Sequence, residues 1–113
     1  MIKLIVAVKK RPDLSAEEFH EHWRTTHAEL IRSTPVCRKY IRRYVQCHTV
    51  PEEYQGGEAP FDGAAELWFD SISDKDAFFQ HPEYLARIRP DELQFADLGR
   101  SKFFVTVEEP VLP

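Results

Sequence analysis

Hydrophobic and polar positions along the chain follow two different periods and so predict both strands and helices. Short runs rich in β-branched residues, with side chains alternating between two sides, are typical of strands. Segments whose apolar residues recur every three or four positions are typical of helices that bury one face. The expected strands cover Ile2–Lys10, Tyr40–Val50, Ala64–Phe69 and Ser101–Glu109, and the expected helices begin at Ala16 and near Ser73.

Capping and breaking residues set the limits of the first helix. Ser15 followed by Glu18 has the spacing of a capping box, so we expect the helix to begin directly after Ser15. Pro35 is expected to end it, because the residue before a proline avoids the helical conformation. The segment 51–60 is rich in proline, glycine and glutamate, and predicts a loop long enough to be functional or mobile.

Shorter helical signals follow in the second half of the chain. Ser73 or Asp74 is expected to cap the second helix, and His81-Pro82 to end it. A short turn is expected at Tyr84–Ile88. Pro90–Phe95 predicts a further helical turn, since proline suits the first helical position.

The order strand, helix, strand, strand, helix, strand is the split βαβ pattern of ferredoxin-like domains. We therefore expect one α+β domain over residues 1–113, with a four-stranded antiparallel sheet and helices on one face. Apolar side chains occupy both sides of the first and last predicted strands, as Phe103 and Phe104 illustrate for the last. Helices cover only one face, so we expect a homodimer through the other sheet face. A monomer with scattered apolar surface residues is the alternative.

Composition argues against nucleic acid and lipid bilayers as partners of this protein. The net charge of −4 argues against a nucleic-acid-binding protein, and no stretch approaches the ~20 apolar residues of a membrane span. Cys37 and Cys47 form neither a disulfide framework nor a zinc motif, so we expect free thiols and a cytoplasmic location. The basic stretch 38–43 is either a solvated strand entrance or a landing site for an anionic partner.

Four segments carry a combined pattern that is more specific than any one of them. They are Glu18-Phe19, His22-Trp23-Arg24-Thr25-Thr26-His27-Ala28, Tyr44-Val45-Gln46-Cys47-His48 and Glu66-Leu67-Trp68-Phe69. Together they resemble the EthD family over nearly the whole chain. The resemblance implies a dimeric α+β barrel, in which two sheets pack face to face, and members that typically lack a cofactor. It also implies relatives that act in polyketide pathways as decarboxylases, cyclases or dehydratases, within a superfamily that includes cofactor-free monooxygenases and isomerases.

His27 is the leading candidate for a catalytic residue. It falls on the apolar face of the first predicted helix, between Trp23 and Leu30. An imidazole with a pKa near 6.5 can take up and return a proton at neutral pH. The family resemblance also places a histidine at this motif position. The alternative is a core histidine that is hydrogen-bonded and inert.

Polar and aromatic residues of two strands are the candidate partners of His27. Their period of two puts Tyr44, Gln46 and His48 on one face of a strand, and Glu66 and Trp68 on one face of another. The predicted catalytic set is His27, Tyr44, His48 and Glu66, and the predicted pocket residues are Phe19, Trp23, Gln46, Trp68 and Phe95. A polar network that only fixes strand register or the dimer contact is equally compatible. Strand parity does not tell which of these residues share a side with His27.

Other chemistries have weaker support. His27, His48, His81 and Glu66 lack a spacing typical of metal ligands, so we expect no metal and no cofactor. The acidic Asp91-Glu92 and Asp97 are typical of helix capping, with a lid over the pocket, plugged by Phe95, as the alternative. The sequence thus predicts a cofactor-independent lyase, cyclase, dehydratase or isomerase for a small aromatic, lactone or polyketide-like substrate. A non-catalytic ligand-binding protein of a degradation pathway and a cofactor-free monooxygenase are the alternatives.

Overall fold

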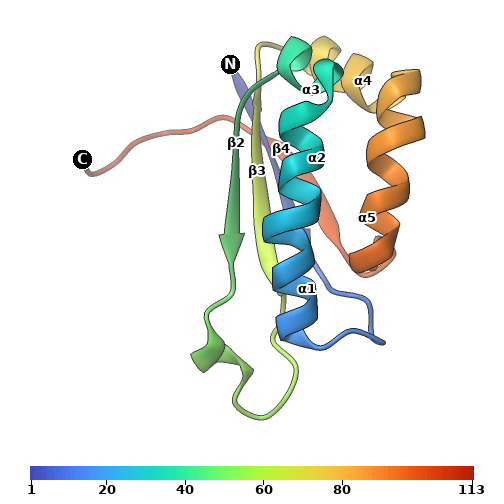
Figure 1. Ribbon diagram of the computed structural model, residues 1–113. Helices are drawn as coiled ribbons and strands as arrows, with labels where there is room; N and C mark the ends of the chain where they lie inside the picture. The colour runs from blue at the N-terminus through green and yellow to red at the C-terminus, as the bar shows by residue number, and fades with distance from the viewer.

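The computed structural model describes residues 1–113, and its elements follow the expected order (Figure 1). The four strands pair antiparallel in the spatial order β2-β3-β1-β4. The strands are β1 (Ile2–Val8), β2 (Ile41–His48), β3 (Gly63–Phe69) and β4 (Lys102–Thr106). This order is the ferredoxin-like arrangement, so the predicted fold class is confirmed.

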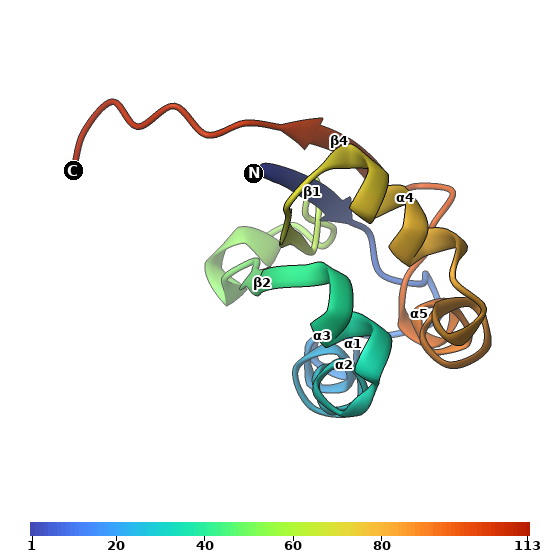
Figure 2. The same ribbon diagram turned by 90° about the horizontal axis from the view of Figure 1, so that it is seen from above.

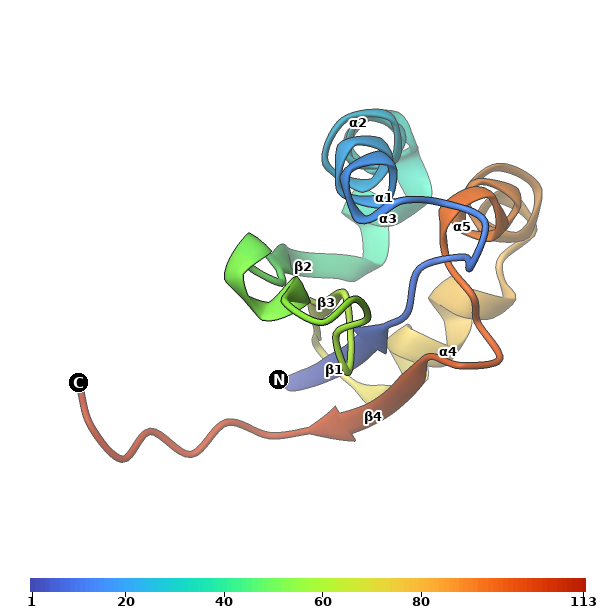
Figure 3. The same ribbon diagram turned by 90° about the horizontal axis from the view of Figure 1, so that it is seen from below.

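The helices form one layer against one face of this sheet, and the other face is left uncovered (Figures 2 and 3). A first column contains α1 (Ala16–His22), the π-helical turn η1 (Trp23–His27), α2 (Ala28–Ser33) and α3 (Pro35–Tyr40). A second group contains α4 (Ile72–Gln80), the π-helical turn η3 (Tyr84–Ile88) and α5 (Arg89–Phe95), and the loop after β2 contains the short turn η2 (Pro51–Tyr54). The α1–α2 column and α5 lie side by side, so residues from distant parts of the sequence meet between them.

The observed helix starts confirm the prediction for α1 and correct it for α3 and α4. The Ser15 hydroxyl accepts a hydrogen bond from the Glu18 amide, and the Glu18 carboxylate accepts one from the Ser15 amide, which completes the predicted capping box. Pro35 does more than end a helix, because it begins α3 at the position that tolerates its missing N–H. Ser71 caps α4, rather than Ser73 or Asp74, because it is the last residue with extended backbone.

Period-two alternation divides the strand residues between a core face and an open face. Leu4, Val8, Leu67 and Phe69 point toward the helices and belong to the hydrophobic core. Their neighbours in sequence point to the open face, where Lys3 forms an ion pair with Glu66 at 2.8 Å. Apolar packing against helices therefore stabilises one face, while the open face carries a mixture of charged and apolar side chains.

The turn η1 keeps a row of side chains in line along the first helical column. Phe19, Trp23, His27 and Ile31 are spaced four apart, whereas an α-helix repeats about every 3.6 residues, so such a row would drift around a regular helix. A π turn needs more residues per turn and corrects that drift. The four side chains consequently stay on the side of the column that faces the sheet and α5.

None of the helices combines the length and the apolar character needed to cross a lipid bilayer.

Candidate functional site

His27 lies at the end of η1 and is almost fully buried, with 3% of its surface exposed. Its Nδ1 is 2.8 Å from Oδ2 of Asp91, in the first turn of α5. The other oxygen of Asp91 is 2.9 Å from Nε2 of His22, so both carboxylate oxygens have a partner. Because a carboxylate accepts hydrogen bonds, Nδ1 of neutral His27 carries the proton and Nε2 is left as a base.

The free nitrogen of His27 opens onto an apolar cavity. No hydrogen bond involves Nε2 of His27. Every fully buried polar side-chain atom in the structure has a partner, so Nε2 is accessible from the cavity rather than enclosed by protein. The cavity has a volume of about 80 Å³, which is room for several water molecules or a planar molecular fragment. Besides His27 and Glu92, its walls include Val8, Tyr44, Leu67 and Phe95.

Glu92 provides a second titratable group in the same cavity. Its Oε1 accepts hydrogen bonds from the Tyr84 hydroxyl at 2.6 Å and from Nε of Arg89 at 3.1 Å. Burial raises the pKa of Glu92, and its contacts with Tyr84 and Arg89 oppose that shift. Tyr84 itself is buried and packs beside the cavity, which holds the Glu92 carboxyl in a fixed position.

The environments of His27 and Glu92 shift their pKa values in opposite directions. Burial lowers the pKa of His27, while the hydrogen bond that Nδ1 donates to Asp91 opposes the shift and stabilises the protonated ring when it forms. A neutral imidazole and a protonated carboxyl are the forms that can act as base and acid in one step. The pKa shifts of His27 and Glu92 are therefore in the directions that favour a base and an acid around one cavity.

The candidates from β2 lie on the core face of the sheet, but only one of them reaches this cavity. Tyr44 lines the cavity, and burial raises the pKa of its hydroxyl to about 12. Gln46 donates to the carbonyl oxygen of Trp23 at 2.8 Å and contacts Nε2 of His48 at 2.8 Å. Gln46 and His48 line a separate groove on the far side of Tyr44.

His48 belongs to a chain of hydrogen bonds that leads away from the cavity. Its Nδ1 is 2.6 Å from Nδ1 of His20, whose Nε2 is 3.1 Å from the Tyr54 hydroxyl. Tyr54 donates to Oδ1 of the fully buried Asp62 at 2.7 Å. Burial, together with the nearby His20 and Arg24, lowers the pKa of His48 to about 4, so His48 is neutral at physiological pH.

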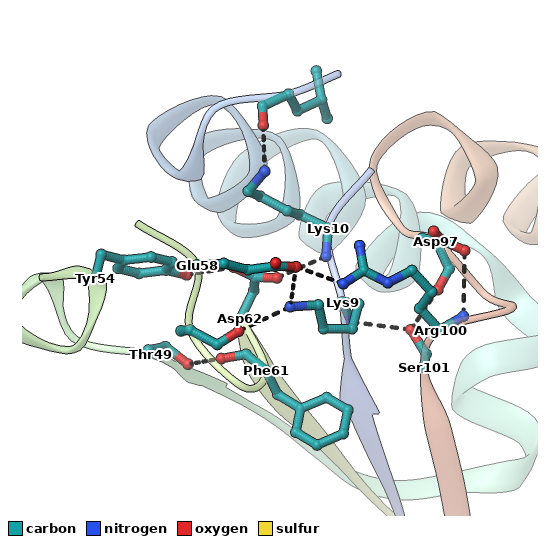
Figure 4. A network of polar contacts seen from close by, with 12 residues as sticks. Lys9, Lys10, Thr49, Tyr54, Glu58, Phe61, Asp62, Asp97, Arg100 and Ser101 are labelled. Carbon is teal, nitrogen blue, oxygen red and sulfur yellow. Dashed lines mark hydrogen bonds and ion pairs between the residues drawn. The ribbon is translucent and has the colours of Figure 1, made fainter. Parts of the chain in front are cut away.

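Polar contacts fix the loop that carries Tyr54, as Figure 4 shows. The Lys10 amide donates to Oδ2 of Asp62 at 2.8 Å. The buried ammonium of Lys9 contacts the Glu58 carboxylate and the Ala59 carbonyl oxygen, each at 2.8 Å. The loop was expected to be functional or mobile, and these contacts show that it is anchored to the end of β1.

Two predicted site residues lie on the wrong face of the sheet. Glu66 and Trp68 point to the open face, where Lys3 pairs with the carboxylate and lies over the indole ring. The sheet itself separates them from His27, so we withdraw them from the candidate site. The reason is that strand parity fixes only relative faces, and β3 uses its odd-numbered residues for the core.

The aromatic pocket residues have different roles. Phe95 lines the cavity, with its ring centroid 4.9 Å from that of His27. Phe19 and Trp23 are buried in the core and pack on each other at 5.4 Å, but they support the cavity rather than line it. They pack the helical column against the sheet and so fix the position of His27 in that column.

Sequence reasoning missed Asp91, Glu92 and Tyr84. It assigned the acidic pair to helix capping, which is the usual role of acidic residues in a first helical turn. Asp91 is 64 residues from His27 in sequence, so no local spacing relates the two. No group of three or more histidine, cysteine, aspartate or glutamate side chains is arranged to hold a metal ion.

A family model described as the EthD domain matches residues 11–99 of the chain. The chain belongs to the EthD family. The resemblance seen in the sequence is thereby confirmed, and the matched region contains His27, Asp91 and Glu92.

This EthD protein is similar to individual proteins and solved structures. A protein of Gibberella zeae named dehydratase aurZ is 29% identical over 116 residues, which span 93% of this chain and 75% of that protein. A crystal structure of an EthD family protein from Bacillus halodurans is 25% identical and has a TM-score of 0.66, covering 96% of this chain and 99% of the other. A dimeric ferredoxin-like protein of unknown function from Bacteroides fragilis is 23% identical, with a TM-score of 0.66 and 92% of each chain covered.

Proposed function

We propose that this EthD protein is a cofactor-free dehydratase or related lyase that acts on a small aromatic or polyketide-like molecule. The observation that carries the proposal is the pairing of an Asp91-supported His27 with Glu92 around one apolar cavity. The name of the Gibberella zeae relative, a dehydratase, supports the same reaction class. Cyclase and isomerase chemistry use the same proton transfers and belong to the same proposal.

The proposed reaction removes water from a β-hydroxy carbonyl compound. Nε2 of His27 takes the proton from the carbon next to the carbonyl group, and Asp91 stabilises the imidazolium that forms. The electron pair released from that C–H bond becomes the new carbon–carbon double bond as the C–O bond breaks. Glu92 donates its proton to the departing hydroxyl group, which leaves as water. Transfer of the His27 proton to the Glu92 carboxylate, through water after product release, restores both groups.

The cavity walls contribute to this reaction by excluding water and fixing the substrate. Thirteen of the sixteen lining residues are hydrophobic, so a planar apolar fragment fits better than a sugar or a nucleotide. Electrostatic interactions are stronger in such a poorly solvated space than in water. The Asp91–His27 pair and Glu92 are therefore more effective here than exposed groups of the same kind.

The test is elimination of water from aromatic β-hydroxy ketones, followed by the absorbance of the new conjugated double bond. We expect His27→Ala and Glu92→Gln each to lower the rate by about 10²–10⁴-fold, the usual contribution of a general base or acid. Glu29→Gln and His81→Gln are matched controls, because neither residue lines the cavity. Turnover that is unchanged in His27→Ala would exclude the proposal, and a ligand that is held without conversion would favour a binding protein.

We also propose that the protein works as a homodimer formed through the open sheet face. The edge strand β4 exposes Phe104 on the open face, opposite Ile5, and Phe103 on the helix side of the sheet edge, with exposed fractions of 52% and 67%. Val107, in the segment after β4, is 73% exposed. Figure 1 shows the C-terminal segment extending away from the body of the protein, where it could reach a second copy. A cluster of this kind is larger than isolated apolar surface residues and is typical of an interface. The dimeric neighbour from Bacteroides fragilis supports the same assembly.

Analytical ultracentrifugation tests the dimer. Phe104→Lys places a charge in the middle of the proposed interface, and we expect it to shift the protein toward the mass of one chain. Ile72→Lys is the matched control, because Ile72 is 55% exposed but lies in α4, away from the open face. A wild-type protein with the mass of one chain at micromolar concentration would rule out this assembly.

A further inference from the structure

A second hollow lies back to back with the catalytic cavity. It is a groove of about 340 Å³, lined by Arg24, Ile31, Arg32, Tyr44, Gln46 and His48. Ile31 and Tyr44 line both spaces, so they form the wall that the two share. The cavity alone holds only a small fragment, and the groove beyond this wall offers space for the rest of a larger substrate.

The groove has the opposite character to the cavity, because two guanidinium groups face it and no carboxylate lines it. The positive charge of Arg24 also reaches His48 and contributes to its lowered pKa. This local positive charge stands out in a chain whose net charge is −4. The groove is therefore suited to a negatively charged group.

The guanidinium groups are free to turn toward a ligand. Arg24 is 3.7 Å from Glu21, and Arg32 is 3.8 Å from Glu29. These are long, exposed pairs within one helical turn, and such pairs are weak. Arg24 and Arg32 are eight residues apart, about 12 Å along a helix, so they flank the groove at its two ends. A planar carboxylate is the anion that a guanidinium recognises through two parallel hydrogen bonds.

The remaining polar residues of the groove, Gln46 and His48, are uncharged and are held in place by hydrogen bonds. Gln46 donates to the Trp23 carbonyl oxygen, so its side-chain oxygen faces His48 and accepts a hydrogen bond from Nε2. Nδ1 of His48 must then be the acceptor in its contact with His20. The contact with Gln46 thus sets the Nε2–H tautomer of His48, and Arg24 and Arg32 are the charged side chains that line the groove.

We infer that the substrate is an aromatic or polyketide-like carboxylic acid, with its ring in the His27 cavity and its carboxylate in the groove between Arg24 and Arg32. This inference rests on the proposed function, since it names the class of molecule that the same site takes. The ring meets the apolar walls, and the charged group stays in the wetter groove beyond Tyr44. A neutral molecule of the same shape loses the contact with the guanidinium groups.

Binding of benzoate and of neutral benzamide, which has nearly the same shape, tests the inference without any turnover. NMR titration of backbone amides measures both affinities, and Ala28 and Gln46 report directly on the groove. We expect benzoate to bind roughly fivefold to tenfold more tightly, as charge-assisted but partly exposed hydrogen bonds would give. The preference should disappear in the double variant Arg24→Gln/Arg32→Gln, while benzamide binding stays the same.

The double variant Arg87→Gln/Lys102→Gln is the matched control, because it removes the same net charge from exposed positions outside the groove. It should keep the preference for benzoate. Absence of benzoate binding, equal affinities in the wild type, or a preference that survives loss of both arginines would each overturn the inference. Loss of turnover in His27→Ala addresses the proposed reaction separately, so the failure of one is distinguishable from the failure of the other.

Discussion

At Gly63, the first residue of β3, the addition of a single methyl group should destabilise the fold. Gly63 lies on the core face of the sheet, directly below the indole ring of Trp23. A methyl group at Gly63 would lie 2.6 Å from Cζ3 of Trp23, and it would be closer still to the carbonyl oxygen of Cys47 in β2. The first contact requires the ring to move, and the second requires the paired strands to separate.

The expected cost of Gly63→Ala follows from these contacts. Carbon atoms in contact are normally about 3.5–4.0 Å apart, so the new methyl group overlaps the ring by about 1 Å. Overpacking of this kind typically costs about 1–3 kcal/mol, and a backbone carbonyl relaxes less easily than a side chain. The reduced freedom of the unfolded chain returns about 0.4–1 kcal/mol. We therefore expect the free energy of unfolding to fall by about 2 kcal/mol.

Urea unfolding followed by circular dichroism measures this change, at one protein concentration because dimer dissociation would contribute. Gly99→Ala is the matched control, since its methyl group would meet nothing nearer than Oδ1 of Asp97 at 3.5 Å. It should leave stability within about 0.5 kcal/mol or raise it slightly. Equal unfolding midpoints for the two variants would refute the reasoning. Because Trp23 supports η1, Gly63→Ala should also shift the NMR signals of the His27 ring.

Three further predictions follow from hydrogen bonds and titration. Ser71→Ala should lower the free energy of unfolding by about 1 kcal/mol in a urea titration, because Ser71 caps α4, whereas Ser73→Ala should have little effect. Asp91→Asn should lower the pKa of His27 in an NMR titration, because Asp91 raises it in the native protein; an unchanged value would show that burial alone sets it. Stability should fall as the pH drops from about 6.5 toward 4, because His48 in the folded state resists the proton that the unfolded chain accepts, and His48→Gln should make this fall less steep.

The sequence predicted well what depends on local patterns. The order of strands and helices follows from periodicity, and the Ser15 capping box follows from two residues at a fixed spacing. The position of His27 toward the sheet also follows, because a four-residue spacing from Trp23 places both on one side of the helical column. Pro35 was interpreted as a terminator only, and the short helix that it begins was missed because six residues carry little periodicity.

The partners of His27 could not be predicted, because they depend on how distant segments pack. Glu66 was a plausible partner on strand parity, but the core face of β3 was not knowable until the helices were placed. Asp91 and Glu92 occupy a first helical turn, where acidic residues are common for reasons unrelated to catalysis. Their role in the candidate site becomes visible only when α5 packs against η1 and brings Asp91 to His27.

The helix α5 links the two halves of the proposed chemistry, because neighbouring residues of its first turn face different partners. Asp91 reaches across to His27 in the other helical column, while Glu92 points to Tyr84 and the cavity. The base and the acid are thus held by consecutive residues of one rigid turn, so they keep their separation when the helix moves. A base fixed by η1 alone and an acid fixed by α5 alone would lose that relation with every shift of one helical column against the other. The pairing of Asp91 with His27 therefore sets the geometry of the whole site as well as the tautomer of one ring.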